Sequence, residues 1–321
     1  YACKVEALRA LMRGVEYYII DPEDEYGRIC ENVGGQYIRL SASSAQHLNP
    51  FDLPPADKDA DARDPLAENV ASLLGLLELM LAPAGGSLDP HERAILDSVL
   101  YQTYATAGIT ADVASHDEPP PLLSDLHALL TWTPGEAAVS LATRLRRYVE
   151  GSLAGLFNSP TNVALDRRLV VFNIQALEPE LRPLAIHLIA GFVWGQVRRS
   201  RRPRLLIIDE AWSLIQYREG GAFLASMARR ARKYYLGLVT ITQDVADFLN
   251  SEHGRTVLSN AALKLLMKQD SSTIEPVVSA FGLSPEERQF LLGAAKGEGL
   301  FFARSSHLAL QVEASPLEHR L

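Results

Sequence analysis

The hydrophobic and polar positions near the start of the chain follow two different periods. Some stretches repeat apolar residues every three or four positions, which indicates helices, and others are short apolar runs, which indicate strands. The predicted helices are residues 1–13 and 26–33, the predicted strands are residues 15–20 and 36–40, and residues 49–52 form a turn. Because strands that alternate with helices build parallel sheets, this part of the chain predicts an α/β fold.

The middle of the chain has no strand signal and a strong helical one. Asp89 and Pro90 supply an N-cap and a proline at the first helical position, and Glu92 completes a capping box. Further helices are predicted from residue 124 and over residues 136–145. This stretch is too long for an ordinary crossover helix between two strands, so we predict an all-α insertion. The predicted segments are residues 1–64, 65–151 and 152–321, with the polar residues 57–64 as the first boundary.

Strand signals return in the last part of the chain. The predicted strands are residues 169–174, 204–208, 237–242, 262–267, 299–303 and 308–312, and the predicted helices are residues 180–199, 221–233 and one that begins at Ser284. The last two strands lie close in sequence and are expected to pair antiparallel. The whole pattern predicts about seven or eight strands with helices between most of them, and a mostly parallel sheet.

Two carboxylates follow the most apolar of these strands. Residues 205–208 are Leu-Leu-Ile-Ile, which is typical of a strand buried on both faces, and Asp209 and Glu210 come next. Ligands of open α/β sheets bind at the carboxyl ends of strands. The pattern has the form of a Walker B element, in which the first acid holds Mg²⁺ through water and the second polarises the attacking water. The alternative is an acidic helix start without chemistry.

Gln243 ends the next predicted strand and could contact a γ-phosphate or orient the attacking water. The same tripeptide, Thr-Gln-Asp at residues 242–244, is also an ordinary turn. Three arginines, Arg229, Arg230 and Arg232, end the preceding helix, where positive charge suits the helix dipole. One of them could instead reach the γ-phosphate of a neighbouring subunit.

A second basic run precedes the Asp209 strand. It consists of Arg198, Arg199, Arg201, Arg202 and Arg204. The run is either a solvated loop or a contact to DNA phosphates. The overall net charge of −8 and the pI near 5.5 give no general affinity for nucleic acid, so a DNA contact must be local.

Composition excludes several other classes. The 321 residues are 47% apolar and 22% charged, as in globular proteins. Two cysteines and eight scattered histidines give neither a disulfide framework nor metal-ligand spacing, and a reducing, cytosolic compartment is expected. The most apolar windows, residues 70–84 and 183–197, are shorter than the roughly 20 residues that span a bilayer. No transmembrane segment or signal peptide is predicted.

The main obstacle to a nucleotide site is the phosphate-binding loop. No G-x-x-x-x-G-K-[ST] occurs in the sequence, although such a loop surrounds the phosphates in these NTPases. The chain begins at Tyr1 inside a predicted helix that leads to an acid-ended strand, which is the position directly after such a loop. We expect the chain to be a fragment whose Walker A loop precedes Tyr1.

In the order of its motifs, the chain resembles the ATPases of type IV secretion and conjugative transfer. The resemblance is to the VirB/TraC/TrbE group, within the FtsK/HerA-like branch of the RecA-like P-loop NTPases, and it spans nearly the whole chain. The matching segments are residues 20–26, 49–52, 157–162, 206–212, 228–234, 242–244 and 297–300. The Asp-Glu-Ala-Trp and Arg-Arg-Ala-Arg-Lys-Tyr segments are the most specific of them.

The resemblance implies a RecA-like core with an all-α insertion, and an ATP hydrolase that uses ATP and Mg²⁺. It implies that Asp209 is the Mg²⁺ residue, Glu210 the catalytic base and Gln243 a polar sensor, with Arg229, Arg230 or Arg232 acting in trans. It also implies a hexamer on the cytoplasmic side of the bacterial inner membrane that contacts the secretion channel. The alternatives are a coupling-protein or HerA-type DNA motor, and a scaffold that docks channel partners without hydrolysing ATP.

Overall fold

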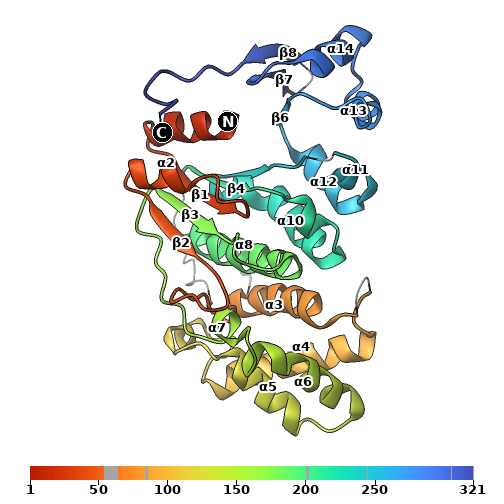
Figure 1. Ribbon diagram of the computed structural model, residues 1–321. Helices are drawn as coiled ribbons and strands as arrows, with labels where there is room; N and C mark the ends of the chain where they lie inside the picture. The colour runs from red at the N-terminus through yellow and green to blue at the C-terminus, as the bar shows by residue number, and fades with distance from the viewer. Residues whose placement is uncertain (54–63, 84–85, 200–201, 244, 305, 321) are drawn as a thin grey trace.

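The centre of the structure is a five-stranded parallel sheet (Figure 1). The structure is a computed structural model that describes residues 1–53, 64–83, 86–199, 202–243, 245–304 and 306–320. The strand order is β2-β3-β1-β4-β5. The strands are β1 (Glu16–Asp21), β2 (Gln36–Arg39), β3 (Leu169–Asn173), β4 (Arg204–Ile208) and β5 (Leu236–Thr240). The predicted α/β fold with a mostly parallel sheet is confirmed.

Helices cover both faces of this sheet (Figure 1). In β1, Tyr17 and Ile19 pack with α1 (Ala2–Leu11) and α2 (Gly27–Asn32), whereas Tyr18 and Ile20 belong to the larger core on the opposite face. That larger core contains α8 (Arg182–Arg199), α9 (Trp212–Ile215) and α10 (Arg218–Arg230). Because successive strand residues face opposite sides, both sides must be apolar. This burial explains the uninterrupted apolar runs of the sequence.

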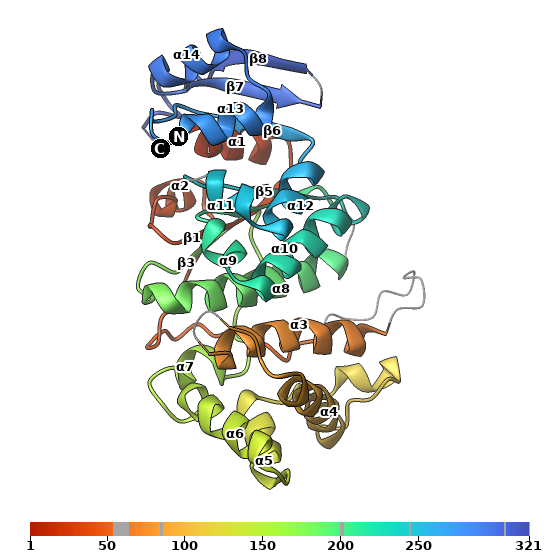
Figure 2. The ribbon, with the colours of Figure 1, turned by 90° about the vertical axis from the view of Figure 1, so that its right-hand side faces the viewer.

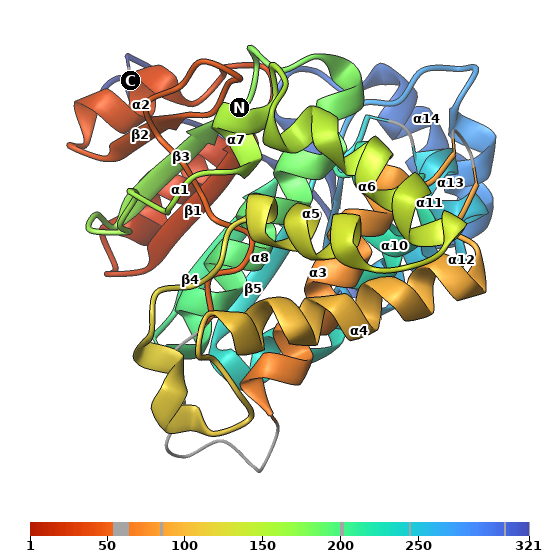
Figure 3. The same cartoon turned by 90° about the horizontal axis from the view of Figure 1, so that it is seen from below.

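Among the described residues between β2 and β3, every regular secondary-structure element is a helix. They are α3 (Pro65–Leu81), α4 (Pro90–Thr106), η1 (Val113–Asp117), α5 (Leu123–Trp132), α6 (Glu136–Val149) and α7 (Ala154–Phe157). Figure 3, the view from below, shows α4, α5 and α6 in front of the rest of the molecule. In Figures 1 and 2, α3 lies between them and α8. The capping box predicted at Asp89 and Glu92 is present and starts α4.

The helical block and the sheet share one apolar core. Leu73 and Leu77 of α3 belong to the same cluster as Leu126 of α5 and Ile189 of α8. Therefore α3 is a layer over α8 and α10 as well as the first helix of the block. The division into residues 1–64, 65–151 and 152–321 stays a prediction, and its first boundary, at residues 57–63, lies outside the described residues.

The end of the chain forms a smaller second layer of its own. After α11 (Val245–Asn250) and α12 (Glu252–Asn260), strands β6 (Leu263–Leu266), β7 (Glu298–Ala303) and β8 (Ser306–Gln311) pair antiparallel. Helices α13 (Ile274–Phe281) and α14 (Pro285–Gly293) contribute to their core, at the top of Figure 2. Among the described residues, no helix combines the length and apolarity that a bilayer span requires.

Candidate functional site

The carboxyl ends of β1 and β4 meet at one edge of the parallel sheet. Ile20 of β1 pairs with Ile208 of β4, so Asp21 and Asp209 follow at the same level. Asp21 is fully buried and accepts hydrogen bonds from the backbone N–H groups of Glu25 (3.0 Å) and Tyr26 (2.9 Å). These bonds order the loop after β1. The sequence therefore places acidic side chains where ligands of α/β sheets bind.

Asp209 is the half-buried carboxylate of this edge. One oxygen, Oδ1, accepts the backbone N–H of Glu210 at 3.0 Å. Burial, reinforced by the negative charges of Glu210, Glu25 and Asp21, raises the pKa of Asp209 to about 6 from its ordinary value of 3.8. The edge thus concentrates more negative charge than its surroundings neutralise, which favours a bound cation.

Glu210 has an uncommon backbone conformation. Its φ is +51°, in the left-handed region that a non-glycine residue adopts at a cost of about 1 kcal/mol. The residues on either side are fixed by hydrogen bonds. The N–H of Asp209 donates to the carbonyl of Ile20 (3.3 Å), and the N–H of Ala211 donates to the carbonyl of Ile241 (3.0 Å). The chain is therefore tied to both neighbouring strands at the point where it turns.

Both carboxylate oxygens of Glu210 accept hydrogen bonds from side chains. Gln243 Nε2 donates to Oε1 at 2.5 Å, and Trp212 Nε1 donates to Oε2. The structure thus brings together Glu210 and Gln243, which are 33 positions apart in the sequence. Asp244, the last residue of the predicted turn, lies outside the described residues. Trp212 was missed as a site residue because nothing in the sequence shows that its indole turns back to Glu210.

The first turn of α1 lies close to the same edge. Lys4 Nζ forms an ion pair with Glu25 (3.1 Å) and lies 5.3 Å from the centre of the Tyr26 ring. Burial, with contributions from the charges of Glu6 and Asp209, raises the pKa of Cys3 to about 11. The positively charged start of α1 therefore lies near the carboxylates, and such a position suits a bound anion beside a cation.

The described residues fit a magnesium ion that is held through few protein ligands. They contain no group of three or more His, Cys, Asp and Glu side chains that could hold a metal alone. Mg²⁺ in phosphate sites commonly uses one or two carboxylates and completes its shell with water and phosphate oxygens. Asp209 has an oxygen for which no protein donor is seen in the described structure, so it suits this role.

The predicted arginines occupy different environments. Arg229 near the end of α10 and Arg232 in the following 3-10 helix η3 (Ala231–Tyr234) are exposed. Arg230 instead forms an ion pair with Glu68 of α3 (3.3 Å) and lies 5.4 Å from the centre of the Trp194 ring. The other oxygen of Glu68 accepts Arg198 of α8. Glu68 therefore connects α3 with α8 and α10.

The basic run before β4 also makes internal ion pairs. Arg204 is buried and pairs with Glu16 at 2.7 Å, and Arg202 pairs with the other oxygen of Glu16 at 3.4 Å. Arg201 and the side chain of Arg199 lie outside the described residues. The arginines that the structure describes in this run thus compensate carboxylates of the same chain.

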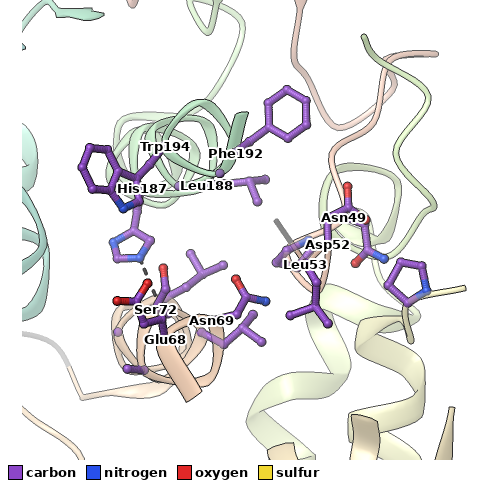
Figure 4. A pocket seen from close by; sticks show the side chains of 18 of the residues that line it. Asn49, Asp52, Leu53, Glu68, Asn69, Ser72, His187, Leu188, Phe192 and Trp194 are labelled. Atoms are coloured by element: carbon purple, nitrogen blue, oxygen red, sulfur yellow. Dashed lines mark hydrogen bonds between the residues drawn. The ribbon is translucent and has the colours of Figure 1, made fainter. Parts of the chain in front are cut away.

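A cavity of about 590 Å³ lies elsewhere, between α3 and α8 (Figure 4). The loop that carries Asn49 and Asp52 also lines it. His187 lines it and is fully buried, with its Nε2 near the carbonyl oxygen of Ser72 (3.2 Å), and burial lowers the pKa of His187 to about 4. The neutral ring therefore donates from Nε2. Asp209, Glu210 and Gln243 do not line this cavity, so it is separate from the acidic edge.

Comparisons with known proteins agree with this architecture. Residues 139–301, about half of the chain, match the family described as TraG P-loop domain. The structure of VirB4 of Thermoanaerobacter pseudethanolicus is 31% identical, with a TM-score of 0.88, and the match covers 99% of this chain and 86% of that one. TraC of Escherichia coli (strain K12) is 25% identical over 329 residues, which cover 94% of this chain.

The chain spans about a third of the length of TraC, since the match covers 34% of that protein. The bacterial conjugative coupling protein TrwBdeltaN70 is 12% identical with a TM-score of 0.66 over 97% of this chain and 82% of that one, which is a likeness of fold alone. The family match and the VirB4 match together decide the assignment. The chain belongs to the TraG P-loop domain family, in the group of type IV secretion and conjugation ATPases that contains VirB4 and TraC.

Proposed function

We propose that the chain is the motor domain of an ATPase that energises type IV secretion or conjugative transfer. The observation that carries the proposal is the acidic edge of the sheet. Asp209 and Glu210 follow β4 directly, and Gln243 from the segment after β5 donates to Glu210. The similarity to VirB4 and TraC supports the same assignment. Because the chain covers only part of TraC, the activity of the whole protein belongs to the proposal.

In this proposal, Glu210 is the general base. Its carboxylate takes a proton from water while the water oxygen forms a bond to the γ-phosphorus, and the bond between that phosphorus and the ADP oxygen breaks. Asp209 would hold Mg²⁺ through water, and bound Mg²⁺ would neutralise charge on the β- and γ-phosphate oxygens. Gln243 would contact the γ-phosphate or the attacking water from the neighbouring strand. ATP is thus the substrate.

The assembly around this site is also proposed. A Walker A loop before Tyr1 would surround the phosphates, next to the first turn of α1. An arginine from a second subunit would complete the site in a hexameric ring, and Arg229 and Arg232 suit this role better than Arg230, which is paired within its own chain. The ring would act peripherally at the cytoplasmic side of the bacterial inner membrane, with secretion-channel components as partners.

Hydrolysis of Mg·ATP by the protein extended upstream of Tyr1, measured beside the 321-residue chain, tests the proposal. Glu210→Gln should lower turnover by about 100-fold or more, since a general base contributes roughly 10²–10⁴. ATP affinity should change little because the exchange preserves the shape of the side chain and leaves Asp209 unchanged. The exposed Glu150→Gln serves as a control that keeps wild-type turnover.

Two results would redirect the assignment. An extended protein that neither binds nor hydrolyses ATP would favour the docking scaffold. ATP hydrolysis that requires DNA, with DNA affinity that falls steeply with salt, would favour a DNA motor of the coupling-protein or HerA type. The ion pairs of Arg198, Arg202 and Arg204 argue against that second outcome, because these arginines already compensate Glu68 and Glu16.

A further inference from the structure

We propose that Trp212 is a positioning residue that holds the carboxylate of Glu210 in its working orientation through the indole N–H. The inference rests on the proposed function, because it concerns how the general base of that site is oriented. Trp212 Nε1 donates to Glu210 Oε2, although the two residues are separated only by Ala211. The two side chains meet where the chain turns from β4 into α9.

The backbone supplies that turn. Glu210 lies in the left-handed region, and the N–H groups of Asp209 and Ala211 donate to Ile20 of β1 and to Ile241, which directly follows β5. In an extended strand, the side chains of residues 210 and 212 would lie on the same face but roughly 7 Å apart along the strand. The strained conformation instead brings the carboxylate back toward the first residue of α9. Strain of this kind persists where surrounding contacts hold it in place.

The indole is well anchored on its other side. Trp212 is half-buried and packs against the large core beneath the sheet, and α9 begins at this residue. Its neighbours Ala211 and Leu214 are fully buried. The ring therefore cannot move without disturbing the core, so its N–H is a fixed donor. A hydrogen bond from a fixed donor to a carboxylate defines the direction of that carboxylate.

The two donors to Glu210 differ in this respect. Gln243 is exposed and reaches Oε1 from the segment after β5, so its amide can turn toward a phosphate without loss of packing. Trp212 stays in place when Gln243 leaves. Oε2 then remains bonded to the indole while Oε1 is available to accept a proton from water. Trp212 therefore fixes the orientation of the Glu210 carboxylate, whereas Gln243 can exchange its hydrogen bond to Glu210 for one to a phosphate.

Trp212→Phe separates this role from packing. Phenylalanine keeps an aromatic ring in the core but removes the N–H donor together with part of the ring volume. Trp212→His is smaller still but retains a ring N–H near the carboxylate. Trp132→Phe is the matched control, because Trp132 is 86% exposed on α5. Thermal unfolding of all three variants checks that each one folds.

The first measurement does not depend on hydrolysis. The chain has three tryptophans, so a ¹⁵N-labelled protein gives three indole N–H signals, and the one lost in Trp212→Phe belongs to Trp212. A proton donated to a carboxylate resonates downfield, and the signal should move when Glu210→Gln replaces the carboxylate by an amide. The signals of Trp132 and Trp194 should stay. A Trp212 signal that ignores Glu210→Gln would overturn the proposal.

The second measurement is ATP turnover by the protein extended upstream of Tyr1. Trp212→Phe should lower kcat by roughly 10- to 100-fold, as expected for loss of a hydrogen bond to a charged group, with KM within about twofold. Trp212→His should recover part of kcat, and Trp132→Phe should keep all of it. Wild-type kcat in Trp212→Phe would overturn the positioning role. Absence of turnover in every version would count against the proposed function alone, because the indole signal decides the contact independently.

Discussion

Replacing Asp209 by asparagine should make the protein more stable at neutral pH while it removes the proposed Mg²⁺ ligand. The pKa of Asp209 rises from 3.8 to about 6, chiefly because the carboxylate is buried. Below pH 3.8 the side chain is protonated in the folded and unfolded states alike. As the pH rises to about 6, the unfolded chain releases its proton first, and folding stability falls. Above pH 6 the folded protein has lost all of the stability that the protonated Asp209 side chain provides at low pH.

The magnitude follows from the size of the shift. A difference of about 2 pKa units corresponds to about 3 kcal/mol at 1.36 kcal/mol per unit. Because the side chain is only half-buried, solvent screening reduces this to about 1–2 kcal/mol. Asparagine carries no charge at any pH and can still accept the N–H of Glu210. Asp209→Asn should therefore gain about 1–2 kcal/mol above pH 6, which raises the unfolding midpoint by roughly 2–4 °C.

Urea unfolding of both proteins between pH 4 and pH 8, without divalent cations, measures this difference. The gain should be near zero at pH 4 and reach its full value above pH 6. Asp97→Asn, at an exposed position of α4, serves as the control and should show no such trend. An Asp209→Asn protein that is no more stable than the wild type at pH 8, or a gain that does not vary with pH, would refute the account of the acidic edge.

Two further predictions concern the cavity and the contact between helices. Burial lowers the pKa of His187 to about 4 from 6.5, so the wild type should lose about 3 kcal/mol of stability as the pH falls from 6.5 to 4. In urea titrations, His187→Gln should lack this part of the acid-induced loss. Glu68→Gln should lower the free energy of unfolding by about 2 kcal/mol in the same assay, because it leaves the largely buried Arg198 without its carboxylate. The control Glu275→Gln, at an exposed ion pair, should lower it by less than about 0.5 kcal/mol. Equal pH slopes for His187→Gln and wild type, or equal costs for the two glutamates, would contradict these expectations.

Local patterns in the sequence were sufficient for the elements of the main sheet. The run before Asp209 predicted a strand buried on both faces, and the structure places its alternate residues in two separate cores. The capping boxes at Asp89 and Ser284 predicted the starts of α4 and α14. These features depend on neighbours within a few positions, so a single sequence contains the information.

Contacts between distant residues could not be predicted in the same way. The run of arginines before β4 left a solvated loop and a DNA contact open. In the structure, Arg198 pairs with a glutamate 130 positions earlier and Arg204 with one 188 positions earlier. The indole contact to Glu210 depends on a backbone conformation that few non-glycine residues adopt. Helices α11, α12 and α13 were also missed, because each has nine residues or fewer and gives a weak periodic signal.

The shared position of α3 has a consequence for building chimaeras. Its residues Leu73 and Leu77 face a core that continues to the sheet, and Glu68 binds arginines of α8 and α10. A graft that exchanges the whole helical block from residue 65 would replace one wall of the recipient's own core. A junction placed after Leu81 would keep that wall and exchange only the helices beyond it. The practical module boundary therefore lies one helix later than the point where strand signals end.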